Sequence, residues 1–318
     1  MIEACRRARI RIDTNARKNF TIMQWKGRRE STNVEDARGE RSGGLGGGGG
    51  GGLGLLMTIG RIFGFKGILV VLVLGGVAWK MGLVDPLALL GGGSSSGAGQ
   101  AEVQASPAEQ ESLNFVKVVL ADTEDVWTSE FARHGQSYPL PMLKVYRSRV
   151  QTACGAGSAA MGPFYCPGDG KVYIDLGFFD ELAQTFKSPG DFAQAYVIAH
   201  EVGHHVQKLL GTSDKVAAMR GQPNYNEFSV RLELQADFYA GVWAHHSKQY
   251  LEHGDIEEAM RAANAIGDDA IQKQQQGRVM PHSFTHGTSA QRTRWFTKGL
   301  ESGKIEDGDT FTLAYQDL

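Results

Sequence analysis

The pentapeptide His200-Glu201-Val202-Gly203-His204 decides how the fold of this chain is interpreted. Two histidines four residues apart on a helix share one face, with about 5–6 Å between their Cβ atoms. Both imidazoles can therefore bind one metal ion. Glu201 lies beside that ion, where its carboxylate can accept a proton from a metal-bound water. The pattern predicts a metal-binding helix.

The residues around the pentapeptide also favour a helix. Ser188 and Pro189 predict its start, as a capping serine followed by proline at the first helical position. Apolar residues then recur at helical spacing, and Gly211 predicts the end. Gly203 costs about 1 kcal/mol inside a helix, so we expect a neighbouring strand or a substrate to approach it closely.

The surrounding sequence predicts an α+β fold that is mainly helical. Apolar periodicity predicts further helices over residues 107–133, 227–246, 255–276 and 288–299. Alternation and turn signals predict strands within 140–150 and over 171–175, which form a small sheet before the metal helix. Because the strand at 171–175 precedes that helix, we expect its edge to accept an extended peptide.

A third metal ligand is needed, since catalytic zinc sites use three protein ligands and a water. The best candidate is Glu233, on the helix predicted over 227–246. Asp237 is four residues further along, so the two carboxylates share a face. One can bind the metal, and the other can accept the free ring N–H of a ligand histidine and fix its tautomer.

Both helices resemble those of the gluzincin metallopeptidases, where His-Glu-x-x-His is followed by Glu-x-x-Ala-Asp. More closely, the chain is similar to a family of bacterial, membrane-anchored neutral zinc metallopeptidases from about Met23 to its C-terminus. The similar segments are HEVGHHVQ (200–207), ELQADFYAGVW (233–243), YCPGDGKVYIDL (165–176) and HGTSAQR (286–292). The resemblance implies a zincin-like domain that binds Zn²⁺ through His200, His204 and Glu233. It also implies that Glu201 is the general base and that Asp237 supports a ligand histidine.

The segment from His286 to Arg292 is similar to the His-Pro…Arg element of membrane-bound prenyl-protein and heat-shock peptidases. Histidine and arginine lie six residues apart in both, although Gly287 replaces the proline here. The similarity implies that His286 or Arg292 stabilises the oxyanion of a tetrahedral intermediate. The remaining histidines are expected outside the site (His134, His205, His245, His246, His253 and His282).

These features predict a zinc peptidase that hydrolyses peptide bonds of a peptide or protein substrate. The alternative is a catalytically silent, zinc-containing membrane scaffold or binding protein. The presence of Glu201 argues against it, because a structural zinc site needs no base. A cytoplasmic regulator that binds nucleic acid or lipid through a basic tail is a further alternative. Basic residues beside an apolar run are more simply topology signals and lipid contacts, so we expect no nucleic-acid partner.

The N-terminal third is basic and rich in glycine. Residues 1–66 hold 13 Lys and Arg against 6 Asp and Glu, and glycines fill much of 43–54 and 91–99. Such glycine-rich stretches are typical of flexible tethers. Between them, the uncharged run 67–79 extends to Ile62–Leu83, which reaches the roughly 20 residues that a membrane span needs.

We therefore predict four parts: a disordered tail (1–61), a single transmembrane anchor (62–83), a tether (84–107) and the metallopeptidase domain (108–318). A cleaved signal peptide is the alternative for the apolar run. The basic excess predicts that the tail lies in the cytoplasm and the domain outside the inner membrane, with lipid contacts along the anchor.

Two cysteines of the domain, Cys154 and Cys166, enclose a loop with glycine and proline. Outside the cytoplasm a disulfide between them would stabilise the fold by roughly 3 kcal/mol. Two unpaired buried thiols are the alternative. Residues 1–22 are rich in arginine without periodicity, which suggests the hypothesis that translation starts at Met23.

Overall fold

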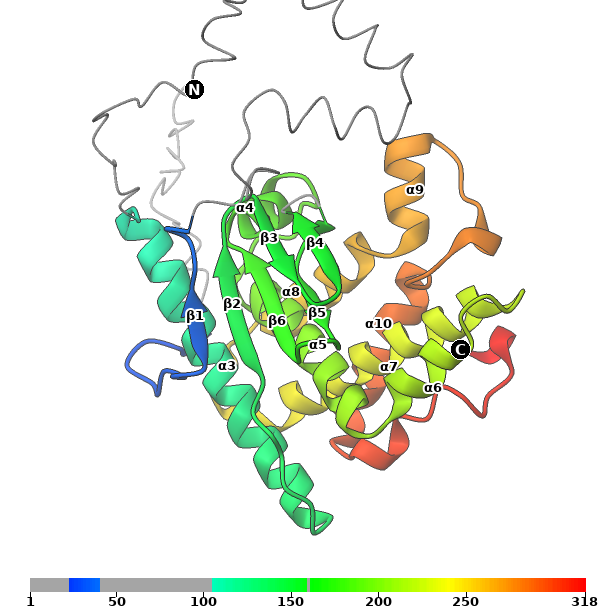
Figure 1. Cartoon of the computed structure of the whole chain (residues 1–318), viewed down its shortest axis with the longest axis horizontal. Coiled ribbons are helices and arrows are strands. Elements are labelled where there is room, and N and C mark those ends of the chain that lie inside the picture. The colour runs from blue at the N-terminus through cyan, green and yellow to red at the C-terminus, as the bar shows by residue number, and fades with distance from the viewer. Residues whose placement is uncertain (1–22, 41–104, 159–160) are drawn as a thin grey trace, which may run out of the picture. The chain divides into compact units, whose positions relative to one another are not determined.

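The computed structural model describes residues 23–40, 105–158 and 161–318 (Figure 1). The described residues up to Arg38 and from Ala105 onward belong to one folded unit. Within the described ranges, no helix has both the length and the apolar character to cross a membrane. Residues 1–22, the predicted anchor at 62–83 and both glycine-rich tethers lie outside them.

Eight α-helices form most of the described unit. They are α3 (Pro107–Arg133), α4 (Gly177–Gln184), α5 (Asp191–Leu209), α6 (Thr212–Ala218), α7 (Tyr225–His246), α8 (Asp255–Ala265), α9 (Asp268–Gln276) and α10 (Ser289–Ser302). The apolar core joins α5 to its neighbours. Phe192 stacks on Trp243 of α7 with ring centroids 5.6 Å apart, and Tyr196 meets Phe296 of α10 edge to face at 5.4 Å.

Two small sheets accompany the helices. The larger has the order β1 (Val34–Asp36), β2 (Met142–Tyr146), β6 (Lys171–Asp175) and β5 (Phe164–Cys166). The pairs β1–β2 and β2–β6 are parallel, and β5–β6 is antiparallel. The second sheet is the hairpin of β3 (Arg149–Thr152) and β4 (Gly155–Ser158). Because β6 pairs on both sides, the prediction that it offers an edge to a peptide is wrong; β5 is the edge nearer the metal helix.

Two helix boundaries also differ from the predictions. The metal helix α5 begins at Asp191 rather than after Ser188, because Gly190 has φ +134°, a conformation that residues with a side chain rarely adopt. The single helix predicted over 255–276 is two helices, α8 and α9, separated at Gly267. A Cβ on Gly267 would lie 2.4 Å from the backbone nitrogen of Ser289, so the chain passes α10 too closely for a helix with side chains.

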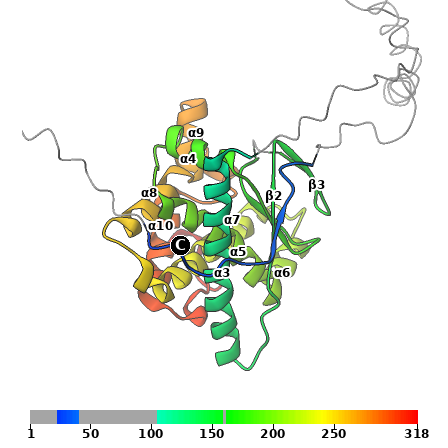
Figure 2. The ribbon, with the colours of Figure 1, turned by 90° about the vertical axis from the view of Figure 1, so that its left-hand side faces the viewer.

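Residues 23–38, which the sequence placed in a disordered tail, are part of the folded unit. Met23 is 1% exposed, and the Trp25 ring packs edge to face on Phe115 of α3 at 5.5 Å. Arg28 forms an ion pair with Asp122 of α3. Figure 2 shows this N-terminal segment crossing α3 and then running as β1 beside β2. The folded domain therefore includes chain from both sides of residues 41–104.

This pairing constrains membrane topology. Adjacent hydrogen-bonded strands must occupy the same compartment, so residues 23–38 and 105–318 lie on the same side of any membrane. A single crossing between them would place them on opposite sides. This pairing argues against the predicted arrangement, with a cytoplasmic N-terminus and an external domain, which cysteine labelling can test. An association of residues 62–83 with a membrane stays a prediction.

In cells that express the full chain, we expect Lys26→Cys and Leu313→Cys to react alike with a membrane-impermeant maleimide. Both side chains are exposed, at 70% and 38%. Each variant is made with Cys5→Ser, while Cys154 and Cys166 are bonded to each other. Both should label before lysis, or both only after it. If only one of the two positions were labelled in intact cells, the two segments would lie on opposite sides of the membrane, as a single crossing requires.

Candidate metal centre

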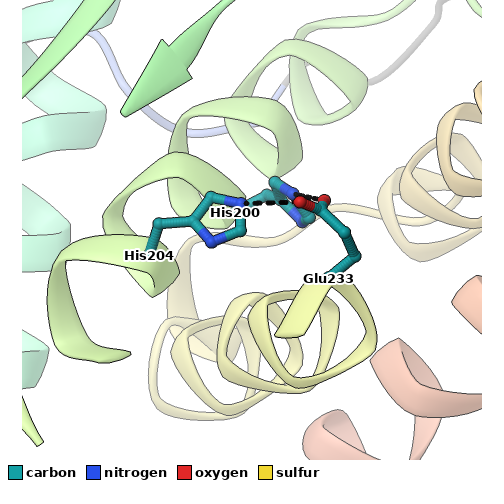
Figure 3. Close-up of side chains that lie close together, drawn as sticks. All are labelled: His200, His204 and Glu233. Atoms are coloured by element: carbon teal, nitrogen blue, oxygen red, sulfur yellow. Dashed lines mark hydrogen bonds and ion pairs between the residues drawn. The ribbon is translucent and has the colours of Figure 1, made fainter. Parts of the chain in front are cut away.

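Three potential ligands from two helices converge on one point (Figure 3). His200 and His204 lie on α5, and Glu233 lies on α7. The Nε2 atom of His200 is 3.2 Å from Oε2 of Glu233, and Nε2 of His204 is 3.6 Å from Oε1. The sequence predicted His200 and His204 from their spacing and Glu233 as the best candidate on the following helix, and the fold brings all three together.

Close packing of α5 on α7 makes this convergence possible. A Cβ on Gly203 would lie 3.0 Å from the carbonyl oxygen of Ala236 and 3.2 Å from its Cα. The neighbour that requires glycine here is therefore a helix, rather than the strand or substrate predicted from sequence. The two histidines and Glu233 face each other because the helix backbones approach so closely.

The opposite ring nitrogens of both histidines are held by other side chains. His200 donates its Nδ1 proton to Oδ1 of Asp237 at 2.8 Å, and His204 donates its Nδ1 proton to Oε1 of Gln207 at 2.8 Å. The Gln207 amide nitrogen donates to Leu232 and Gln235, which fixes its orientation. Nε2 is thus the nitrogen of each ring that is left to bind a metal ion once its proton is lost.

The spacing and chemistry of these atoms fit zinc. A tetrahedral centre with bonds of about 2.0–2.1 Å separates its ligand atoms by roughly 3.3–3.4 Å, close to the separations of 3.2 and 3.6 Å from Glu233 to the two rings. Two imidazole nitrogens and one carboxylate form one of the ligand sets of catalytic zinc, which leaves a fourth position for water.

Asp237 is the centre of a buried network behind His200. Its carboxylate is fully buried and accepts from His200, from Tyr196 at 2.5 Å, and from Nε and Nη2 of Arg292 at 2.8 and 2.9 Å. Burial alone would raise the pKa of Asp237, but the charges of Arg292 and His200 lower it to about 2. Asp237 therefore stays ionised and holds the His200 ring in place.

Arg292 does not face the substrate side of this centre. Its guanidinium is 3% exposed, binds both oxygens of Asp237 and donates to the carbonyl oxygen of Ile266 at 3.2 Å. The position favours a role in holding Asp237, instead of the oxyanion contact that the resemblance implied. No motif or spacing indicated a role for the two other members of this arrangement, Tyr196 and Gln207.

Charge distribution around the ligands favours a bound cation. Burial lowers the pKa of both histidines, but nearby carboxylates outweigh it: Asp237 raises the pKa of His200, and Glu233 raises that of His204 to about 9. Burial raises the pKa of Glu233, yet the two histidines hold it well below its usual range. Zinc binding would replace these ring protons, so its affinity should fall as pH decreases.

Glu201 and His286 border the same region. Glu201 is 8% exposed, and its charge contributes to the raised pKa of His204. His286 is half exposed, and its Nδ1 lies 3.1 Å from Oδ1 of Asp268, while Oδ2 of Asp268 accepts its backbone N–H at 2.6 Å. Burial lowers the pKa of His286, but Asp268 and Glu233 raise it above its usual value.

Neighbouring residues complete the surroundings of α5. His205 points away from the ligands: Pro139 accepts from its Nε2 at 2.7 Å, and its Nδ1 lies 3.1 Å from the hydroxyl of Tyr165 on β5. This contact places β5 beside the metal helix. Cys166, the last residue of β5, forms a disulfide with Cys154 at the turn of the β3–β4 hairpin. The bond therefore ties the hairpin to the edge strand.

Two histidines and a glutamate in this arrangement, with Glu201 between the histidines in sequence, are typical of zinc metallopeptidases. Residues 23–311 match the family described as "Putative neutral zinc metallopeptidase", and the chain belongs to that family. It is 50% identical over 295 residues to the Uncharacterized protein YpfJ of Escherichia coli K12, covering 91% of this chain and 99% of the relative. It is 46% identical over 190 residues to the Uncharacterized protein Rv2575 of Mycobacterium tuberculosis, covering 56% of this chain and 64% of the relative. No solved structure matches.

Asp237→Asn should weaken zinc binding about 10- to 100-fold, because the amide no longer supplies the charge that orients His200. Competition with a fluorescent chelator measures the affinity. Glu227→Gln, an exposed acid in the first turn of the same helix, is the matched control and should bind zinc normally. Equal affinities in both variants would contradict a supporting role for Asp237, provided that circular dichroism shows both to be folded.

Proposed function

We propose that this protein is a zinc-dependent peptidase that hydrolyses peptide bonds. The observation that carries the proposal is the convergence of His200, His204 and Glu233 with Glu201 on the same helix. Bound zinc would lower the pKa of its water to about 7 and polarise the scissile carbonyl. Glu201 would accept the proton of that water and deliver it to the departing amine.

The other residues of the site would position ligands or stabilise charge. Asp237 holds His200 through Nδ1, and Arg292 holds Asp237. His286, whose pKa is raised by Asp268 and Glu233 against the effect of burial, is suited to donate a hydrogen bond to the oxyanion. We assign that role to His286 rather than to Arg292, whose donors already contact Asp237.

An extended substrate would bind along β5. This strand pairs only with β6 among the described residues, so one of its edges can accept main-chain hydrogen bonds. The contact between Tyr165 and His205 keeps that strand beside α5. A peptide added there would pass close to the metal ligands, which supports hydrolysis of extended peptides or unfolded protein segments.

The place of action is also a proposal. The disulfide between Cys154 and Cys166 favours an oxidising compartment outside the cytoplasm. Because β1 pairs with β2, the N-terminal segment would be there too. We propose that residues 62–83 attach the chain to lipid without separating these two parts of the domain. A silent zinc-containing scaffold is the second candidate, and the presence of Glu201 argues against it.

Glu201→Gln should keep zinc stoichiometric while lowering peptide cleavage by at least ~100-fold, because the amide cannot accept the proton of water. Metal analysis and cleavage of a mixed peptide library by the wild type and the variant measure both effects. Glu227→Gln, at the exposed start of α7, should cleave like the wild type. Cleavage that persists in a zinc-loaded Glu201→Gln protein would rule out this mechanism.

A further inference from the structure

A second group of acids lies at the start of the metal helix. Asp191 is the first residue of α5, and Asp255 and Glu258 lie in the first turn of α8. One carboxylate oxygen of each lies within 4.8 Å of the others. Gly190 makes room for them, since a Cβ there would lie 2.0 Å from Oε2 of Glu258. We call Asp191, Asp255 and Glu258 the acidic cluster.

Two oxygens of the acidic cluster lack a hydrogen-bond partner. Asp255 is 1% exposed and its Oδ1 has no hydrogen-bond partner; Oδ2 of Asp191 has none either. Burial is the main reason why the pKa of Asp191 is raised to about 6 and that of Glu258 to about 7. Repulsion from the neighbouring carboxylates raises both pKa values further. The charges of Asp191 and Asp255 act on Glu258 more strongly than that of Arg261. The acidic cluster therefore favours a cation.

The backbone nitrogen of Met23 points at this cluster. Its N–H donates to the carboxylate of Asp191, and the Met23 residue is 1% exposed. The next residue is fixed as well, because the backbone N–H of Gln24 donates to Tyr250 at 2.9 Å and its side chain donates to Glu252. Within a peptide bond this nitrogen carries one N–H and no charge. As the first nitrogen of a chain it would be an ammonium with three N–H donors.

The family match begins at Met23, which agrees with a start at this residue. We propose that the mature protein begins at Met23 and that the acidic cluster is the binding site of its α-ammonium group.

A divalent cation is the rival occupant, because three carboxylates are also suitable ligands for Ca²⁺ or Mg²⁺. The Met23 N–H argues against it, since a donor that already contacts the Asp191 carboxylate leaves a metal ion fewer free ligand atoms there. An ammonium uses this geometry, and its further donors can reach the unpartnered oxygens of Asp191 and Asp255. The contact would fasten the N-terminal segment to the first turn of the metal helix.

The test compares zinc-loaded protein that starts at Met23 with the same protein extended by Gly-Ser-Gly and with the full 318-residue chain. The Met23 form should unfold about 2–6 °C higher than either, because only it carries the charge next to the acidic cluster. In Asp191→Asn this difference should shrink. In Glu257→Gln, an exposed neighbour on α8, it should persist. Equal midpoints for the Met23 and extended forms would overturn the proposal.

Two further measurements separate the occupants and the start site. The pH dependence of the acylation rate measures the pKa of the α-amino group in the Met23 form. This pKa should exceed the usual value of about 7.7–8.0, and in Asp191→Asn it should return to that range. Intact mass of protein made from its own gene should correspond to a start at Met23. A mass that includes residues 1–22 would overturn the proposal. It would also be overturned if Ca²⁺ or Mg²⁺ raised the unfolding temperature of the wild type but not that of Asp255→Asn. The peptidase activity plays no part in these readouts, so its failure would leave them unaffected.

Discussion

The buried charge of Asp237 is the interaction on which the rest of this structure depends. A lone ionised carboxylate in a protein core costs several kcal/mol. Here His200 and Tyr196 of α5 and Arg292 of α10 all donate to it. The same contacts that compensate the charge join α5, α7 and α10, and they orient the first metal ligand. Fold stability and ligand geometry therefore depend on one set of hydrogen bonds. Loss of Asp237 would leave the buried charge of Arg292 without its partner, and loss of Arg292 would do the same to Asp237.

Such short contacts between helices require small residues on their facing sides. Gly203 lets α5 approach Ala236. On the other side of α7, a Cβ on Gly241 would lie 2.1 Å from the carbonyl oxygen of Phe296, and one on Gly299 would lie 2.0 Å from that of Phe238. The helix α7 is thus held between two neighbours at near backbone contact. Glycine inside a helix is unfavourable by about 1 kcal/mol relative to alanine, and here it permits the packing that places Glu233 and Asp237.

Local patterns allowed much of this to be predicted. Four-residue spacing paired His200 with His204 and Glu233 with Asp237 as candidates, which the fold brings together, and apolar periodicity placed α3 at its observed bounds. The errors came from contacts between distant residues. Pairing of Val34 with Leu143 adds a strand, β1, that no local pattern predicts, and the pairing of β5 with β6 places β6 in the interior of the sheet. The break at Gly267 results from the approach of Ser289, which no local pattern around 255–276 encodes.

The position of the N-terminal segment gives this architecture a further consequence. Its residues contact α3, the loop before α8 and the first turn of α5, while β1 extends the sheet whose opposite edge, β5, lies beside the metal helix. The start of α5 is therefore held by Met23, and the middle of α5 is held by Asp237 of α7. The segment that the sequence suggested was a tail is instead one of several elements that hold the metal helix.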